Sequence, residues 1–170
     1  MQTTLNKIKS HLPCEPGWGK LLNHLNKTEA DDEVLELRTI LESNGLYDTI
    51  WAFQAVEGKD KEIRLFAADC ADMVLHIYEK QYPNNDRPRK AIQAARDYAN
   101  GLINAEELDA AGDAAVLAAA WAAMAAARGA AWSARGAAWN AWNAAKAAGD
   151  ATGTAGAAAD EIKSLLLKYI

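Results

Sequence analysis

The stretch KEIRLFAADCADMVLHIYEKQY, from Lys61 to Tyr82, decides the fold class of this 170-residue chain. Its apolar residues recur every three or four positions over about five turns, which is the spacing of one face of an α-helix. These residues are Ile63, Phe66, Cys70, Met73, Val74 and Ile77. A strand would need apolar and polar residues in alternation, and no sustained alternation occurs along the chain. The sequence therefore predicts an all-α protein, built as a compact multi-helix bundle.

Three more helices are predicted on the N-terminal side of this stretch. The first runs from Pro16 to Lys27, with proline tolerated in its first turn. After a break at residues 28–32, a second helix carries an apolar stripe and stops at Ser43-Asn44-Gly45, residues that tolerate left-handed backbone. Its stripe consists of Val34, Leu37, Ile40 and Leu41. The third helix runs from Leu46 to Val56, and Gly58 ends it.

Two helix starts are predicted on the C-terminal side. Asp86 is placed to cap a helix that ends at Gly101, and Asn104 with Glu107 has the spacing of a capping box. A loop is expected over residues 150–156. The last helix, residues 160–170, should then pack on the body of the protein through Ile162, Leu165, Leu166 and Tyr169.

Alanine dominates the chain from Asn104 to Ala159, which divides it into residues 1–103 and 104–170, expected to pack as one domain. Alanine favours helix but offers little side-chain volume, so the few large residues have to make the contacts. At about 100° per residue these large residues form a single stripe. The stripe consists of Leu117, Trp121, Met124, Arg128, Trp132, Arg135, Trp139, Trp142 and Lys146. It fits either a core-facing surface or a protein-binding face, with a break expected near Gly129 or Gly136.

The charge balance narrows the classes of partner. A net charge of −5 and a pI near 5.2 argue against direct nucleic-acid binding and against an anionic membrane surface. They favour a basic protein partner. No apolar run approaches the roughly 18 residues of a membrane span, and the N-terminus lacks the apolar core of a signal peptide. The expected location is the cytoplasm.

No group of residues has the spacing of a catalytic, cofactor or metal site. The three histidines, His11, His24 and His76, are far apart in sequence, and no nucleophile elbow or phosphate-binding glycine loop occurs. Cys14 and Cys70 form no CxxC pair, so two free thiols are expected. We therefore expect a protein that is not an enzyme and needs neither metal nor cofactor.

Two acidic groups are candidates for contact with a partner. Asp69 and Asp72 lie three residues apart on one helix. The main expectation is that they form an ion-paired face with Arg64 and Lys80 nearby. The alternative is an acid–base pair or a cation site. The run at residues 31–33 is expected in the first turn of a helix, where the helix dipole favours negative charge; its alternative is contact with a basic partner. With the stripe, the candidate partner-binding residues are Asp31, Asp32, Glu33, Asp69, Asp72, Arg128, Trp132, Arg135 and Trp139.

Several segments resemble the immunity proteins of bacterial polymorphic-toxin loci and of phage and prophage genomes. They are CEPGWGKLLNHLNKTEADDE, LRTILESNGLYDTIWAFQAVEGKDKEIRLFAADCADMVLHIYE, DRPRKAIQAARDYANG and the alanine-rich tail. The likeness extends over most of the chain and is most specific in TILESNGL and in DRPRKAIQAARDYANG. It implies an all-helical cytoplasmic protein that neutralises a toxin by binding it.

Two other functions fit the same sequence. One is a phage anti-defence inhibitor, such as an anti-CRISPR protein, which would bind a bacterial defence effector. The other is a structural module whose alanine-rich helices pack against copies of themselves in a homo-oligomer. A toxin gene upstream would favour immunity, a phage locus with a small helix-turn-helix regulator would favour anti-defence, and a concentration-dependent mass would favour self-assembly.

Overall fold

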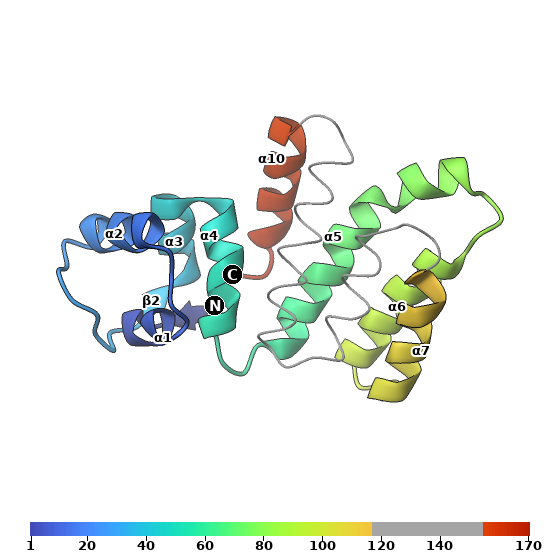
Figure 1. Cartoon of the computed structure of the whole chain (residues 1–170), viewed down its shortest axis with the longest axis horizontal. Coiled ribbons are helices and arrows are strands. Elements are labelled where there is room, and N and C mark those ends of the chain that lie inside the picture. Colours follow the sequence, from blue (N-terminus) through green and yellow to red (C-terminus); the bar gives the residue numbers. More distant parts are fainter. Residues whose placement is uncertain (117–154) are drawn as a thin grey trace.

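The computed structural model describes residues 1–116 and 155–170. Within these residues the chain forms eight α-helices, one 3-10 helix and one two-stranded ribbon, which confirms the all-α class (Figure 1). The elements are β1 (Gln2–Thr3), α1 (Leu5–Ser10), α2 (Glu15–His24), β2 (Leu35–Glu36), α3 (Leu37–Asn44), α4 (Leu46–Trp51), η1 (Ala52–Ala55), α5 (Asp60–Gln81), α6 (Arg87–Ala99), α7 (Ala105–Val116) and α10 (Ala155–Leu166).

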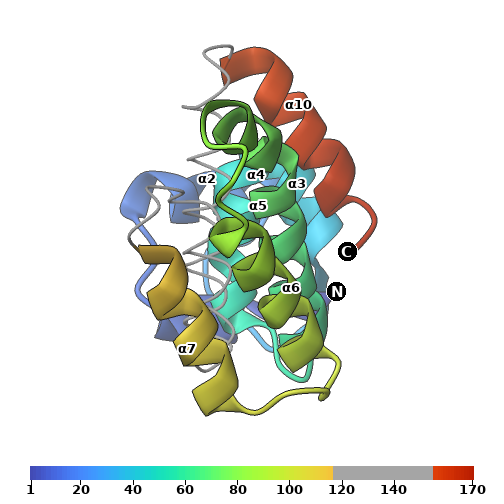
Figure 2. The ribbon, with the colours of Figure 1, turned by 90° about the vertical axis from the view of Figure 1, so that its right-hand side faces the viewer.

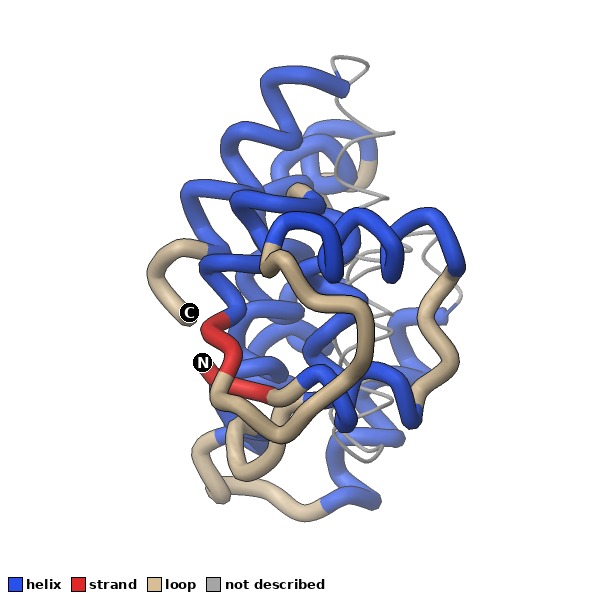
Figure 3. Tube along the Cα trace, turned by 90° about the vertical axis from the view of Figure 1, so that its left-hand side faces the viewer, coloured by secondary structure: helices blue, strands red, loops and turns tan. Residues whose placement is uncertain are grey.

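The long helix α5 runs through the middle of the molecule (Figure 1). The short helices α1 to α4 form one end, and α6 and α7 lie on the other side of α5. Helix α10 packs against α5, and the two chain ends lie close together in each of three views (Figures 1, 2 and 3). The last helix of the chain thus packs against α5, the helix whose sequence predicts the fold class.

The predicted face of α5 is the centre of the main core. Ile63, Phe66 and Cys70 are buried, and Phe66 packs edge-to-face on Phe53, with ring centroids 5.5 Å apart, and on Tyr169 at 5.9 Å. Edge-to-face packing is a favoured arrangement of aromatic rings. The prediction that the C-terminal helix packs on the body is confirmed, since Ile162 and Leu166 are buried in this core and Leu165 packs against it.

A second, smaller core joins α5 to α6 and α7. Most of its buried residues are alanines, which allow the helices to approach closely. They are Ala68, Ala71, Leu75, Ala91, Ile92, Ala94, Ala95 and Leu108. The opposite faces of α5 therefore hold two different neighbours in place.

Most of the predicted helix ends are confirmed. Gly45 has φ +93° between α3 and α4, a conformation that favours glycine. The capping box before α7 is complete. The backbone N–H of Glu107 donates to Asn104 Oδ1 at 3.0 Å, and the backbone N–H of Asn104 donates to Glu107 Oε2 at 2.9 Å. Asp86 precedes α6 as predicted, but its carboxylate pairs with Lys90 at 2.8 Å and does not cap the helix.

The N-terminal part differs from the prediction in three places. Helix α2 ends at His24 and not at Lys27. Helix α1 and the ribbon were not predicted, and the stripe does not begin at Val34, whose side chain is 68% exposed. The first residues of the chain pair with residues 35–36, and the Leu37 amide donates to the Met1 carbonyl at 3.0 Å. This pairing holds the backbone extended, so α3 starts only at Leu37.

Two further boundaries differ. The helix predicted from Leu46 to Val56 is divided into α4 and η1, and α10 begins at Ala155, so residues 155–156 are helical and not part of a loop. The predicted break near Gly129 or Gly136 lies outside the described residues.

Candidate partner-binding site

The acidic run Asp31-Asp32-Glu33 lies in the loop between α2 and β2, and not in the first turn of a helix as predicted. The Lys27 ammonium pairs with the carboxylates of both Asp31 and Glu33, the latter at 2.6 Å. The backbone carbonyl of Asp31 also accepts a hydrogen bond from the backbone N–H of Asn6 at 3.0 Å, which connects the loop to α1. The ribbon that follows keeps this backbone extended, and this is why no helix starts here.

The ion pairs of this loop shift the pKa values of Asp31 and Lys27. The hydrogen bond from Lys27 holds the pKa of Asp31 below the usual value, and the same bond, with the one to Glu33, raises the pKa of Lys27. Exposed ion pairs contribute little to stability, so the effect of this arrangement is mainly on surface charge. Asp32 is exposed and remains a candidate for contact with a basic partner.

Asp69 and Asp72 form a closed network between elements that are far apart in sequence. Arg96 of α6 donates to Asp69 at 2.8 Å and to Asp72 at 2.9 Å, and the Tyr169 hydroxyl donates to Asp69 at 2.6 Å. Burial raises the pKa of Tyr169, and the bond to the carboxylate raises it further. Desolvation would lower the pKa of Arg96, but the two carboxylates outweigh it and the pKa is raised.

The ion-paired face expected on α5 is therefore present with a different cation. Arg64 lies over the ring of Tyr98, 5.3 Å from its centroid. The cation that pairs with Asp69 and Asp72 is Arg96. The network joins α5, α6 and the C-terminal segment, which is a structural role for both aspartates. Their proposed contact with a partner remains a prediction.

The remaining candidates, Arg128, Trp132, Arg135 and Trp139, lie outside the described residues. Whether their stripe faces the core or a partner also remains a prediction.

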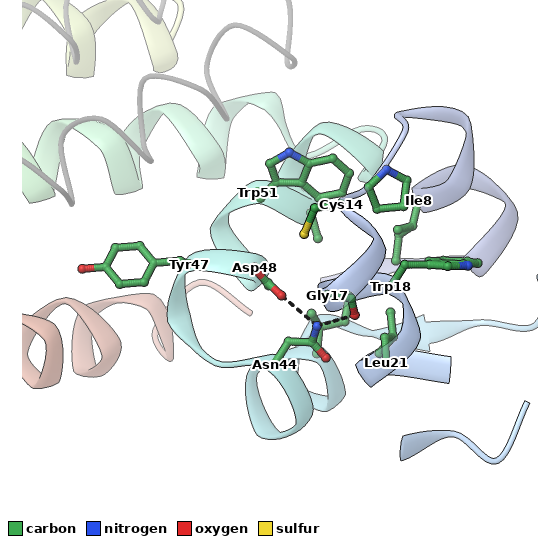
Figure 4. Close-up of a pocket in the computed structure, with 12 residues that line it drawn as sticks. Ile8, Cys14, Gly17, Trp18, Leu21, Asn44, Tyr47, Asp48 and Trp51 are labelled. Atoms are coloured by element: carbon green, nitrogen blue, oxygen red, sulfur yellow. Dashed lines mark hydrogen bonds between the residues drawn. The ribbon is translucent and has the colours of Figure 1, made fainter. Parts of the chain in front are cut away.

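A pocket of about 210 Å³ lies among α1, α2, α3 and α4 (Figure 4). Its walls are mostly apolar, with the indoles of Trp18 and Trp51 on different sides. The lining residues are Ile8, Pro13, Cys14, Gly17, Trp18, Leu21, Ile40, Asn44, Tyr47, Asp48, Trp51 and Ala52. Tyr47 lies at the edge, directed away from the other labelled side chains.

One end of the pocket is polar, and Asn44 organises it. Its amide nitrogen donates to the Gly17 carbonyl and to Asp48 Oδ2, both at 2.8 Å, while its oxygen accepts from the Ser43 hydroxyl at 2.7 Å. Glycine at position 17 permits this close approach, because a Cβ there would lie 2.8 Å from Asp48 Oδ2 and 3.1 Å from the sulfur of Cys14, and both side chains would have to shift. The polar end is therefore held in one arrangement.

Sequence reasoning did not find this pocket. The sequence predicts Asn44 only as part of a helix stop, which is compatible with a second role. The available signal was Gly17-Trp18-Gly19 inside a predicted helix, because glycine is a poor helix former and two such residues beside an aromatic side chain need a packing reason.

The negative charge of the chain is concentrated at the end that holds the pocket. Residues 1–58 contain five lysines and arginines and nine aspartates and glutamates, a net charge of −4 out of −5 for the whole chain. A basic partner would therefore be attracted chiefly to this end.

The described residues offer neither a metal site nor a membrane span. No three histidines, cysteines or carboxylates lie close enough together there to hold a metal ion. Over residues 1–116 and 155–170, no helix combines the length and the apolar character needed to cross a membrane. Both thiols are free, with Cys14 exposed and Cys70 buried.

Comparison with known proteins adds one finding. A family model described as Imm-5 like putative immunity protein matches residues 55–164. No curated protein and no solved structure matches the chain. All the residues that line the pocket precede the matched region, whereas α5, α6, α7 and most of α10 lie within it.

Proposed function

Because the chain belongs to the family of Imm-5 like putative immunity proteins, we propose that it is an immunity protein that neutralises a toxin by binding it. The family match carries this proposal, since it spans nearly two thirds of the chain and includes the helix α5 around which the fold is built. Binding without turnover is part of the proposal. One molecule would occlude one toxin molecule.

The charge distribution supports a basic toxin as the partner. The acidic end would speed the encounter with a positively charged surface, and buried aromatic side chains would then hold the complex. The expected location of this binding is the cytoplasm, where an immunity protein would meet a toxin that has entered or is made in the cell.

The direct test is co-expression with the protein encoded by the neighbouring gene. The chain should restore growth of cells that make this toxin, and the purified pair should form a complex of fixed stoichiometry in light scattering. Inhibition of the toxin should stop increasing once that ratio is reached. If one molecule inactivates many toxin molecules, binding is the wrong mechanism.

The electrostatic part has its own test. Asp32→Lys places a cation in the acidic loop, and it should slow association severalfold at low salt and much less at high salt, because salt screens exposed charges. Asp109→Lys, an exposed change on α7, is the matched control and should have a smaller effect. Equal effects of the two variants would show that the acidic loop does not guide the encounter.

Other outcomes identify the alternatives. Protection against a defence effector, with none against a toxin, would identify an anti-defence inhibitor. A chain that binds neither and only self-associates would be a structural module.

A further inference from the structure

The pocket among α1 to α4 has the size of a site for one side chain. Its volume of about 210 Å³ is many times the roughly 10–15 Å³ that a cavity needs to hold one water molecule. It is smaller than the roughly 300–1,000 Å³ of pockets that bind small molecules and cofactors. A single large side chain from a partner therefore matches it better than a cofactor does.

The chemistry of the walls selects among side chains. Two indoles and several aliphatic groups favour an apolar stem, and an indole face also attracts a cation. Asp48 is the one charged residue of the lining, and it is only partly exposed. A hydrophobic side chain alone would cover this carboxylate without pairing it, which costs free energy.

Asp48 is held in position without a counter-ion from the described part of the chain. Its Oδ2 accepts from the neutral side-chain amide of Asn44, and none of the ion pairs found between described residues involves Asp48. Asp31, Asp69 and Asp72, by contrast, each have a cation. The start of α4 favours a negative charge at Asp48 but supplies no cation.

We infer that this pocket receives an arginine side chain of the toxin. The arginine stem packs between the aliphatic and indole walls, and the planar guanidinium stacks on an indole while it donates to Asp48. Lysine fits less well, because its ammonium is strongly hydrated and cannot stack or bind the carboxylate with two parallel hydrogen bonds. This inference rests on the proposed function for the identity of the partner.

The position of the pocket is consistent with recognition of one particular partner. Its lining residues all precede residue 55, where the family match begins. Specificity is a difference between affinities, and contacts that vary between relatives can supply it while a shared helical body carries them. In this chain the pocket lies outside the region that the family model matches.

The first experiment tests the pocket on the purified full chain, with blocked tripeptides as probes. Each peptide carries arginine, lysine, leucine or glutamate between two glycines, and heteronuclear NMR follows the indole N–H resonances of Trp18 and Trp51. Arginine should shift them at the lowest concentration, lysine and leucine should bind severalfold more weakly, and glutamate should not bind. No shift with arginine, or binding of leucine as tight as that of arginine, overturns the inference.

A variant then tests the charge. Asp48→Asn keeps an oxygen for the Asn44 amide and should weaken arginine binding about tenfold, with leucine binding unchanged. Asp109→Asn makes the same change on exposed α7 and should leave both unchanged. Equal arginine binding by the two variants overturns the inference, and the wild-type titration decides by itself if Asp48→Asn does not fold.

The second experiment separates this inference from the proposed function. The wild type, Asp48→Asn and Asp109→Asn are compared for affinity to the toxin encoded by the neighbouring gene, and for protection of cells. A loss of about tenfold or more in affinity for Asp48→Asn alone supports the inference. If the wild type protects and Asp48→Asn binds as tightly as Asp109→Asn, the inference fails and the proposed function stands. If the wild type does not protect, the proposed function fails and the toxin is excluded as the source of the arginine.

Discussion

Gly17→Ala tests how closely α2 approaches the polar end of the pocket. The added Cβ would lie 2.8 Å from Asp48 Oδ2, so the carboxylate must rotate and lose the hydrogen bond from Asn44, at a cost of about 1 kcal/mol. Crowding against Cys14 at 3.1 Å costs about 1 kcal/mol more. Alanine returns at most about 1 kcal/mol as the better helix former. The variant should therefore lose about 1 kcal/mol of stability.

Gly19→Ala is the matched control, because it makes the same change two residues further along the same helix. No atom lies within 4 Å of the Cβ that it would add, so the gain in helix propensity is not offset. This variant should gain about 0.5–1 kcal/mol. Urea unfolding followed by far-ultraviolet circular dichroism measures both changes, provided that the slope with denaturant stays the same.

A double-mutant cycle with Asp48→Ala assigns the cause. If the carboxylate is what crowds position 17, Gly17→Ala should be better tolerated in the Asp48→Ala background, with a coupling energy of about 1 kcal/mol. A Gly17→Ala variant that is stabilised as much as Gly19→Ala would refute the close approach of α2 to Asp48.

Three further variants test the rest of the structure. Arg96→Met should lower the free energy of unfolding by about 1–2 kcal/mol in a urea titration, because two partly buried aspartates lose their shared cation. Arg89→Met removes a more exposed ion pair and should lower it less. Equal losses in the two variants would argue against the network. Asn104→Ala should cost about 1 kcal/mol by removing the cap of α7, and an unchanged melting temperature would contradict the capping box. The pKa of Asp31 is lowered in the folded protein, so this group adds stability above about pH 4 that is lost as the pH falls through the lowered pKa. The Asp31→Asn variant should therefore lose less stability than the wild type on acidification below about pH 4. The same loss of unfolding free energy in both proteins over this pH range would contradict the prediction.

The helical class and most helix ends could be predicted from local sequence, because they depend on residues three or four positions apart. The apolar face from Ile63 to Cys70 is buried as its spacing predicts, and the Asn104–Glu107 box forms between neighbours in the chain. The start of α3 could not be predicted in the same way, because it depends on pairing with the first residues of the chain, for example between Gln2 and Glu36 across 34 positions.

Residues distant in sequence decided the candidate site, and only the tertiary structure brings them together. Arg96 meets Asp69 across 27 positions and Tyr169 meets the same carboxylate across 100, while Asn44 reaches the Gly17 carbonyl across 27. Charge and composition predicted an acidic, helical protein with a basic partner. They could not show that Asp31, Asp69 and Asp72 pair with cations, nor that Asp48 lies in a pocket and makes no ion pair with any described lysine or arginine, because both depend on how the helices pack.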